Sequence, residues 1–127
     1  MSELKIRIDT RFYRICVHRQ TLRAIGDPPF LNFSYEPDSR LLIVSGKWVD
    51  DRKSVRVRYD NSGSVYVFSK ALLLGIQKAS HILMGHCSYL AEGEVMESGK
   101  AIIFPLGLAQ KLTVPAQNSP SDGTEVP

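Results

Sequence analysis

Basic side chains at alternating positions are the residues of this sequence best suited to chemistry, and that chemistry is phosphate binding. Arg56 and Arg58 alternate with apolar residues at positions 55–59, and Lys5 and Arg7 do so earlier in the chain. Successive side chains of a strand point to opposite faces, so each row lies on one face. Arginine can hold a phosphate through two parallel hydrogen bonds. The set that we predict to hold phosphates comprises Arg11, Arg14, Arg19, Arg23, Lys47, Arg52, Lys53, Arg56 and Arg58.

Two interpretations of this basic set stay open at the level of sequence. In the first, the rows converge on one positive surface, where Phe12 and Trp48 add stacking or wedge contacts to nucleic acid. In the second, the cations lie on solvated strand faces and are neutralised by Asp9, Asp50, Asp51 and Asp60. We expect the aromatic residues Trp48, Tyr59 and Tyr66 at the core or its rim.

Nucleophilic and metal chemistry have little support in the sequence. His81, His86 and Cys87 lie near one another, but a structural zinc site takes four ligands, and only Cys16 or His18 is left to complete one. No glycine pattern of a nucleophile elbow or a phosphate-binding loop accompanies these residues. We therefore expect no enzyme, no metal and no cofactor.

The charge is uneven along the 127 residues. Residues 1–60 contain 12 Lys and Arg against 8 Asp and Glu, whereas residues 61–112 contain 4 against 3. An isoelectric point near 9.0 is compatible with a polyanionic partner. No stretch reaches the roughly 20 apolar residues of a membrane span, and we identify no secretory signal. With only two cysteines, we expect free thiols, a cytoplasmic protein and no membrane contact.

The periodicity predicts a β-rich α+β fold, with one globular domain over residues 1–112 and a disordered tail at 113–127. Helices are expected at 18–25, where Gly26 and two prolines stop the first one, and at 70–83. Arg19 and Arg23 are four residues apart on the first helix and share a side. Strands are expected at 4–8, 12–18, 55–59 and 65–68, and hairpins at 30–36 with 40–44 and at 89–96 with 101–104.

The order of these elements indicates an internal repeat. Residues 4–48 and 54–106 each contain a strand, a helix and a hairpin, so we expect two βαββ-like halves packed as one domain. The early parts match at an offset of 50 residues and the hairpins at an offset of 60. One such unit cannot cover its own apolar face, and two can cover each other. The alternative is that an α+β chain of this size shows such an order by chance.

The run RICVHRQTLRAIG at positions 14–26 resembles the core of the AbrB/MraZ/SpoVT group of swapped-hairpin DNA-binding proteins. In that group a strand runs into a short helix that contains a Leu-Arg step, the chain then reaches a glycine, and a two-stranded hairpin follows. The resemblance covers the first half only, and His18 stands where the group usually has a proline. It implies a fold that binds DNA as an interlocked dimer.

These observations predict a small bacterial-type DNA-binding regulator that holds phosphates through its basic first half, and a homodimer as its assembly. The alternative is a non-enzymatic protein-interaction module or inhibitor. Such a protein would use a hairpin edge or the apolar strip Phe30-Leu31-Asn32-Phe33 to bind a protein partner.

Overall fold

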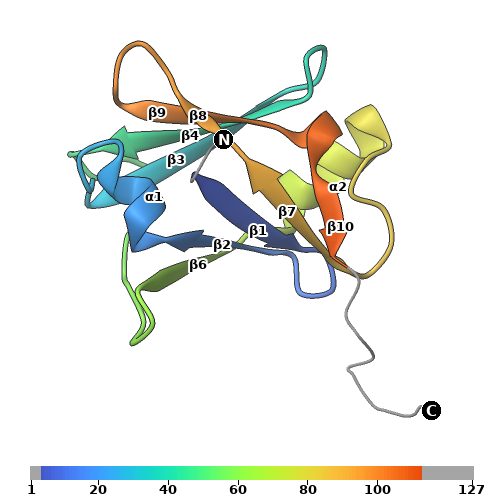
Figure 1. Cartoon of the computed structure of the whole chain (residues 1–127), viewed down its shortest axis with the longest axis horizontal. Coiled ribbons are helices and arrows are strands. Elements are labelled where there is room, and N and C mark those ends of the chain that lie inside the picture. The colour runs from blue at the N-terminus through green and yellow to red at the C-terminus, as the bar shows by residue number, and fades with distance from the viewer. Residues whose placement is uncertain (1–3, 113–127) are drawn as a thin grey trace.

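Two antiparallel β-sheets of five strands each form the body of the protein (Figure 1). The computed structural model describes residues 4–112, so the tail predicted at 113–127 lies outside the described residues. No helix in this described part is both long and apolar enough to cross a membrane.

The first sheet has the strand order β10–β7–β1–β2–β6. Its strands are β1 (Lys5–Asp9), β2 (Arg14–His18), β6 (Ser64–Phe68), β7 (Ser88–Glu92) and β10 (Gln110–Leu112). The second sheet has the order β5–β3–β4–β9–β8. Its strands are β3 (Phe30–Glu36), β4 (Leu41–Lys47), β5 (Val55–Arg56), β8 (Glu94–Val95) and β9 (Ala101–Pro105).

The core lies between the two sheets and is formed by the side chains that alternate inward along each strand. Ile6 of β1 and Ile15 of β2 meet Leu42 of β4 and Phe104 of β9 in one buried cluster. Burying an apolar side chain of this size stabilises a fold by about 1.5–3 kcal/mol. The outward residues of β1, β2 and β6 therefore form a solvent-facing surface whose backbone is held by the core beneath it.

Between residues 4 and 112 the structure also has two α-helices and one short 3₁₀-helix: α1 (Arg19–Arg23), α2 (Lys70–Ser80) and η1 (Leu106–Leu108). His18 caps α1, because its Nδ1 accepts the backbone N–H of Gln20 at 3.1 Å. The predicted second helix is wrong at its end, since His81 adopts a left-handed φ of 54° and terminates α2 there.

The predicted strand at 89–96 is in fact two strands in different sheets, and the chain crosses between them at Gly93. A Cβ at Gly93 would lie 2.6 Å from the carbonyl oxygen of Ile103 and 2.6 Å from the Phe104 ring, so only glycine fits this crossing. The strand predicted at 55–59 is also shorter, since only Val55–Arg56 is paired.

Strand register bears on the predicted repeat. β2 and β6 pair so that Cys16 faces Tyr66, and β4 and β9 pair so that Ile43 faces Ile103. These separations equal the offsets of 50 and 60 found in the sequence. However, β7 joins the first sheet whereas its counterpart β3 joins the second. The β-rich character is confirmed, and the division into two strand–helix–hairpin halves is not.

Candidate nucleic-acid interface

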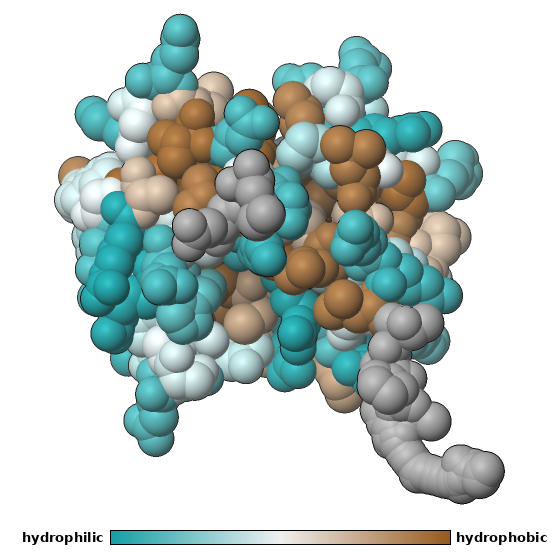
Figure 2. All heavy atoms as spheres, viewed as in Figure 1, coloured by the Kyte–Doolittle hydropathy of each residue, from teal (hydrophilic) through white to brown (hydrophobic). Residues whose placement is uncertain are grey.

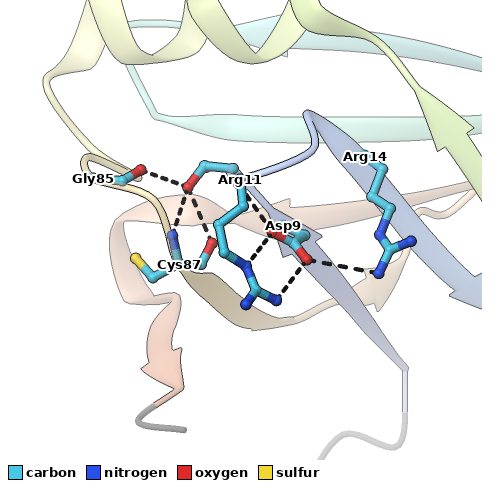
Figure 3. A network of polar contacts seen from close by, with 6 residues as sticks. Asp9, Arg11, Arg14, Gly85 and Cys87 are labelled. Atoms are coloured by element: carbon cyan, nitrogen blue, oxygen red, sulfur yellow. Dashed lines mark hydrogen bonds and ion pairs between the residues drawn. The ribbon is translucent and has the colours of Figure 1, made fainter.

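The turn between β1 and β2 brings two arginines to one buried carboxylate (Figure 3). Asp9 is only 3% exposed. Its oxygens accept hydrogen bonds from Arg11 Nε at 3.1 Å, Arg11 Nη2 at 3.0 Å and the Arg11 backbone N–H at 2.9 Å. Arg14 Nη2 lies 3.7 Å from the same carboxylate.

Burial of the Asp9 carboxyl acts to raise its pKa, but the hydrogen bonds and charges of Arg11 and Arg14 outweigh it and hold the pKa below its usual range. Asp9 is therefore ionised at neutral pH. One negative charge is shared by two guanidinium groups, so the turn keeps a net positive charge.

Thr10 anchors this turn to a distant part of the chain. Its hydroxyl donates to the Gly85 carbonyl at 2.6 Å and accepts the Cys87 backbone N–H at 3.0 Å (Figure 3). The Thr10 backbone N–H donates to the Cys87 carbonyl at 2.9 Å. On the other side of the turn, the N–H of Ser69 donates to the Tyr13 carbonyl at 2.9 Å. The two arginines are thus presented by a fixed backbone.

Arg14 contacts two exposed aromatic rings. Its guanidinium carbon lies 5.2 Å from the centroid of Phe12 and 5.0 Å from that of Tyr66, which are distances of cation–π contact. Arg11 lies 5.4 Å from the Phe12 ring. We call the outward set on β2, β6 and the adjoining turn the arginine–aromatic face, and it comprises Phe12, Arg14, Cys16, Tyr66 and Phe68.

The strand register explains why these side chains share one side of the sheet. Arg14 faces Phe68 and Cys16 faces Tyr66 across the β2–β6 pair, and residues directly opposite one another point to the same face. Arg7 of β1 faces Cys16 and extends the same row. The charge of the ionised Cys16 sulfur and its hydrogen bond with Tyr66 raise the pKa of Tyr66; desolvation and the charge of Asp60 add to this, and Arg14 opposes it.

A second group of cations lies at the other end of β2. Arg19 and Arg23 of α1 line a hollow of about 380 Å³ with His18 and the 60–63 loop. His18 Nδ1 is an acceptor, so its Nε2 carries the proton and donates to the Ser62 carbonyl at 3.2 Å.

The guanidinium of Arg19 is held over the Tyr59 ring, at 4.4 Å from its centroid. The Tyr59 hydroxyl donates to Asp27 Oδ1 at 2.6 Å. Burial of the hydroxyl and this hydrogen bond to Asp27 raise the pKa of Tyr59 to about 12. Arg19 is thus placed by the ring beneath it, while Arg23 at the end of α1 is exposed.

The other members of the predicted basic set lie elsewhere. Arg56 and Lys47 flank Phe30 across the second sheet, with Arg56 5.1 Å from the Phe30 centroid. Arg58 is exposed beyond β5. Arg52 and Lys53 lie in a turn where the Lys53 N–H donates to Asp51 Oδ1. The predicted set is therefore spread over both sheets, α1 and the segments on either side of β5.

Of the four aspartates predicted to neutralise the basic residues, only Asp9 does so within residues 4–112. The ion pairs in this part of the chain are those of Asp9 with Arg11 and with Arg14. Asp60 accepts the N–H groups of Ser62 and Ser64. Asp50 and Asp51 stabilise the turn at residues 50–54. The last three carboxylates hold local loops and leave the arginines elsewhere without a paired anion.

Two expectations about apolar residues are wrong. Tyr66 and Trp48, expected at the core or its rim, are 42% and 49% exposed. The strip at positions 30–33, which the alternative protein-interaction function would use if it were exposed, is part of β3, and its residues Phe30 and Leu31 are buried and paired with both β4 and β5. On the side shown in Figure 2, apolar residues occur in separate clusters among hydrophilic ones.

Sequence reasoning missed Phe68 and misplaced Tyr66. The sequence contained a signal for their outward position, because Val65 and Val67 alternate with them, and both valines are buried.

Cys16 and Cys87 are free thiols. Among the described residues no group of three or more His, Cys, Asp or Glu is placed to hold a metal ion. Comparisons with protein-family models, curated proteins and solved structures found no match.

Proposed function

We propose that this chain is a non-enzymatic DNA-binding protein whose interface is the arginine–aromatic face, extended at one end by Arg11 and at the other by Arg19 and Arg23. The observation that carries the proposal is the position of Arg14. Its guanidinium contacts the exposed rings of Phe12 and Tyr66 and shares a single carboxylate with Arg11.

Charge supports this proposal. Asp9 offsets one of the two positive charges at the β1–β2 turn, and Asp60 is engaged in its own loop near the second group. Arg7 adds an exposed cation to the same sheet face. A row of arginines with this surplus attracts phosphates and releases their counterions on binding.

Geometry supports it as well. Arg14 opens β2 and His18 ends it, so the two cationic groups are about 13 Å apart at the usual rise of a strand. Thr10 fixes the first group and the Tyr59 ring supports Arg19 in the second. Cations that are already in place lose little conformational freedom on binding.

The test is the salt dependence of binding to a fluorescein-labelled DNA, followed by anisotropy. Arg14→Ala should weaken binding and lower the slope of log K against log salt by about one phosphate contact. Arg19→Ala with Arg23→Ala should lower it further. Lys78→Ala removes an exposed cation of α2 and should leave both quantities unchanged.

Circular dichroism would show that each variant is folded. Absence of DNA binding by the unmodified protein at low salt would refute the proposal. So would equal losses of affinity in Arg14→Ala and Lys78→Ala, because the arginine–aromatic face would then have no special part in binding.

We further propose that the chain arose by internal duplication and acts as a bacterial-type regulator. Pairing of Cys16 with Tyr66 and of Ile43 with Ile103 supports duplication, since two equivalent strands related by a local twofold axis pair at equivalent residues. The homodimer implied by the AbrB/MraZ/SpoVT-like resemblance stays a prediction, which the molar mass from light scattering would test.

A further inference from the structure

We infer that the nucleic acid taken by the arginine–aromatic face is single-stranded, with unpaired bases stacked on Phe12, Tyr66 and Phe68. This inference rests on the proposed function and specifies its substrate class. Two observations carry it: the exposure of the rings and the placement of the arginines among the rings.

The three rings are exposed although the fold has a core to receive them. Phe12 is 57%, Tyr66 42% and Phe68 68% exposed. A single exposed aromatic residue on a protein surface is ordinary, but Tyr66 and Phe68 lie together on the outward face of β6, and Phe12 in the adjoining turn contacts the same arginine, Arg14, as Tyr66 does. Aromatic side chains displayed on a sheet are the platform on which unpaired bases stack.

The exposed rings favour an unpaired strand over a duplex. Tyr66 and Phe68 lie on β6, an edge strand of the first sheet, and both side chains are exposed. The bases of a duplex are stacked on one another and show only their edges in the grooves. They therefore offer these rings no face to stack on, whereas a single strand can lie across the arginine–aromatic face with its bases turned toward the protein.

The arginines sit where the backbone of such a strand would run. Arg14 contacts the rings of both Phe12 and Tyr66, and the guanidinium carbon of Arg11 lies 5.4 Å from the centroid of the Phe12 ring. A guanidinium in contact with a ring keeps its edge N–H groups available for phosphate, and it can itself stack on a base. Rings and cations that alternate in this way match a chain in which bases alternate with phosphates.

The experiment compares three labelled probes of equal length: oligo-dT, a DNA duplex and oligo-U. The double variant Phe12→Leu/Tyr66→Leu keeps apolar bulk and removes two rings. It should bind oligo-dT at least tenfold more weakly with an unchanged salt slope, because stacking and not charge has been lost. Trp48→Leu removes a ring of similar exposure outside the face and should bind oligo-dT as the unmodified protein does.

The outcomes separate this inference from the function on which it rests. Tighter binding of oligo-dT than of duplex, with loss in the ring variant, supports the inference. The same ring dependence with tighter oligo-U binding also supports it and assigns RNA as the source of the strand. Duplex binding as tight as that of oligo-dT, with no effect of the ring variant, overturns the inference and leaves DNA binding intact. No binding of any probe at low salt refutes both.

Discussion

Asp9→Asn is expected to destabilise the protein by about 1–2 kcal/mol at pH 7. In the structure the Asp9 carboxylate accepts three hydrogen bonds from Arg11 and lies 3.7 Å from Arg14. A hydrogen bond to a charged group contributes about 1.5–3 kcal/mol and a neutral one about 0.5–1.5 kcal/mol. Asparagine keeps one acceptor oxygen and removes the charge. Because the Arg11 side chain is 44% exposed, water screens the lost interaction, and we expect a loss of stability at the lower end of the range for charged hydrogen bonds.

The effect of this substitution should depend on pH. The pKa of Asp9 is depressed in the folded state, so its stabilisation is complete above the unfolded pKa of about 3.9 and is lost as pH falls through the folded pKa. Urea unfolding of both proteins, followed by circular dichroism from pH 7 downward, measures the difference in free energy. That difference should be constant above about pH 5 and shrink below it.

A difference that persists undiminished at the lowest pH would refute this account, because the protonated aspartic acid would then still stabilise the turn better than asparagine does. The absence of any difference at pH 7 would show that the Arg11 contacts contribute nothing. Asp9→Asn also leaves two arginines with no carboxylate between them, so under the proposed function its affinity for DNA should rise at low salt.

Two further sets of variants test the hydrogen bonds of the Thr10 hydroxyl and the packing around two glycines. Thr10→Val should cost about 1–3 kcal/mol in thermal unfolding, because the polar groups that its hydroxyl bridges lose their partner, whereas Thr10→Ser should stay close to the unmodified protein. Gly93→Ala should cost at least about 1–3 kcal/mol through overpacking, since its Cβ would lie 2.6 Å from neighbouring atoms. Gly75→Ala, at a helical position with open space around it, should instead stabilise by about 0.5–1 kcal/mol. Equal effects of the two alanines would contradict the reasoning on packing.

Much of the fold follows from local patterns. The alternation at residues 4–8 and a hairpin at 30–36 with 40–44 were predictable, because an inward apolar row and a turn are both local features, although the second strand of the hairpin runs from Leu41 to Lys47. The helix stop near Gly26 was predictable for the same reason. The split at Gly93 was not, because the need for glycine there comes from β9, whose residues follow about ten positions later.

The candidate site was predictable only in part. The sequence indicates that Arg14 points away from the core, since Ile15 and Val17 point inward. It does not indicate that β2 pairs with β6, a contact between segments 50 residues apart that brings Tyr66 beside Arg14. An aromatic residue in an amphipathic strand suits either face by composition. Alternation with the buried Val65 and Val67 assigns Tyr66 to the outward face, whereas the strand that lies beside it is set by long-range pairing, which is not local information.

The mixing of strands from the two sides of the 48–54 connection has a consequence for cleavage of the chain. Strands from before and after the 48–54 connection are neighbours in both sheets, through β1 with β7, β2 with β6 and β4 with β9. A protease cut at the exposed residues 50–53 would therefore leave two fragments held together without a peptide link. Neither piece carries a complete set of hydrogen-bonded neighbours, so the fragments should reassemble on mixing and fail to fold when kept apart.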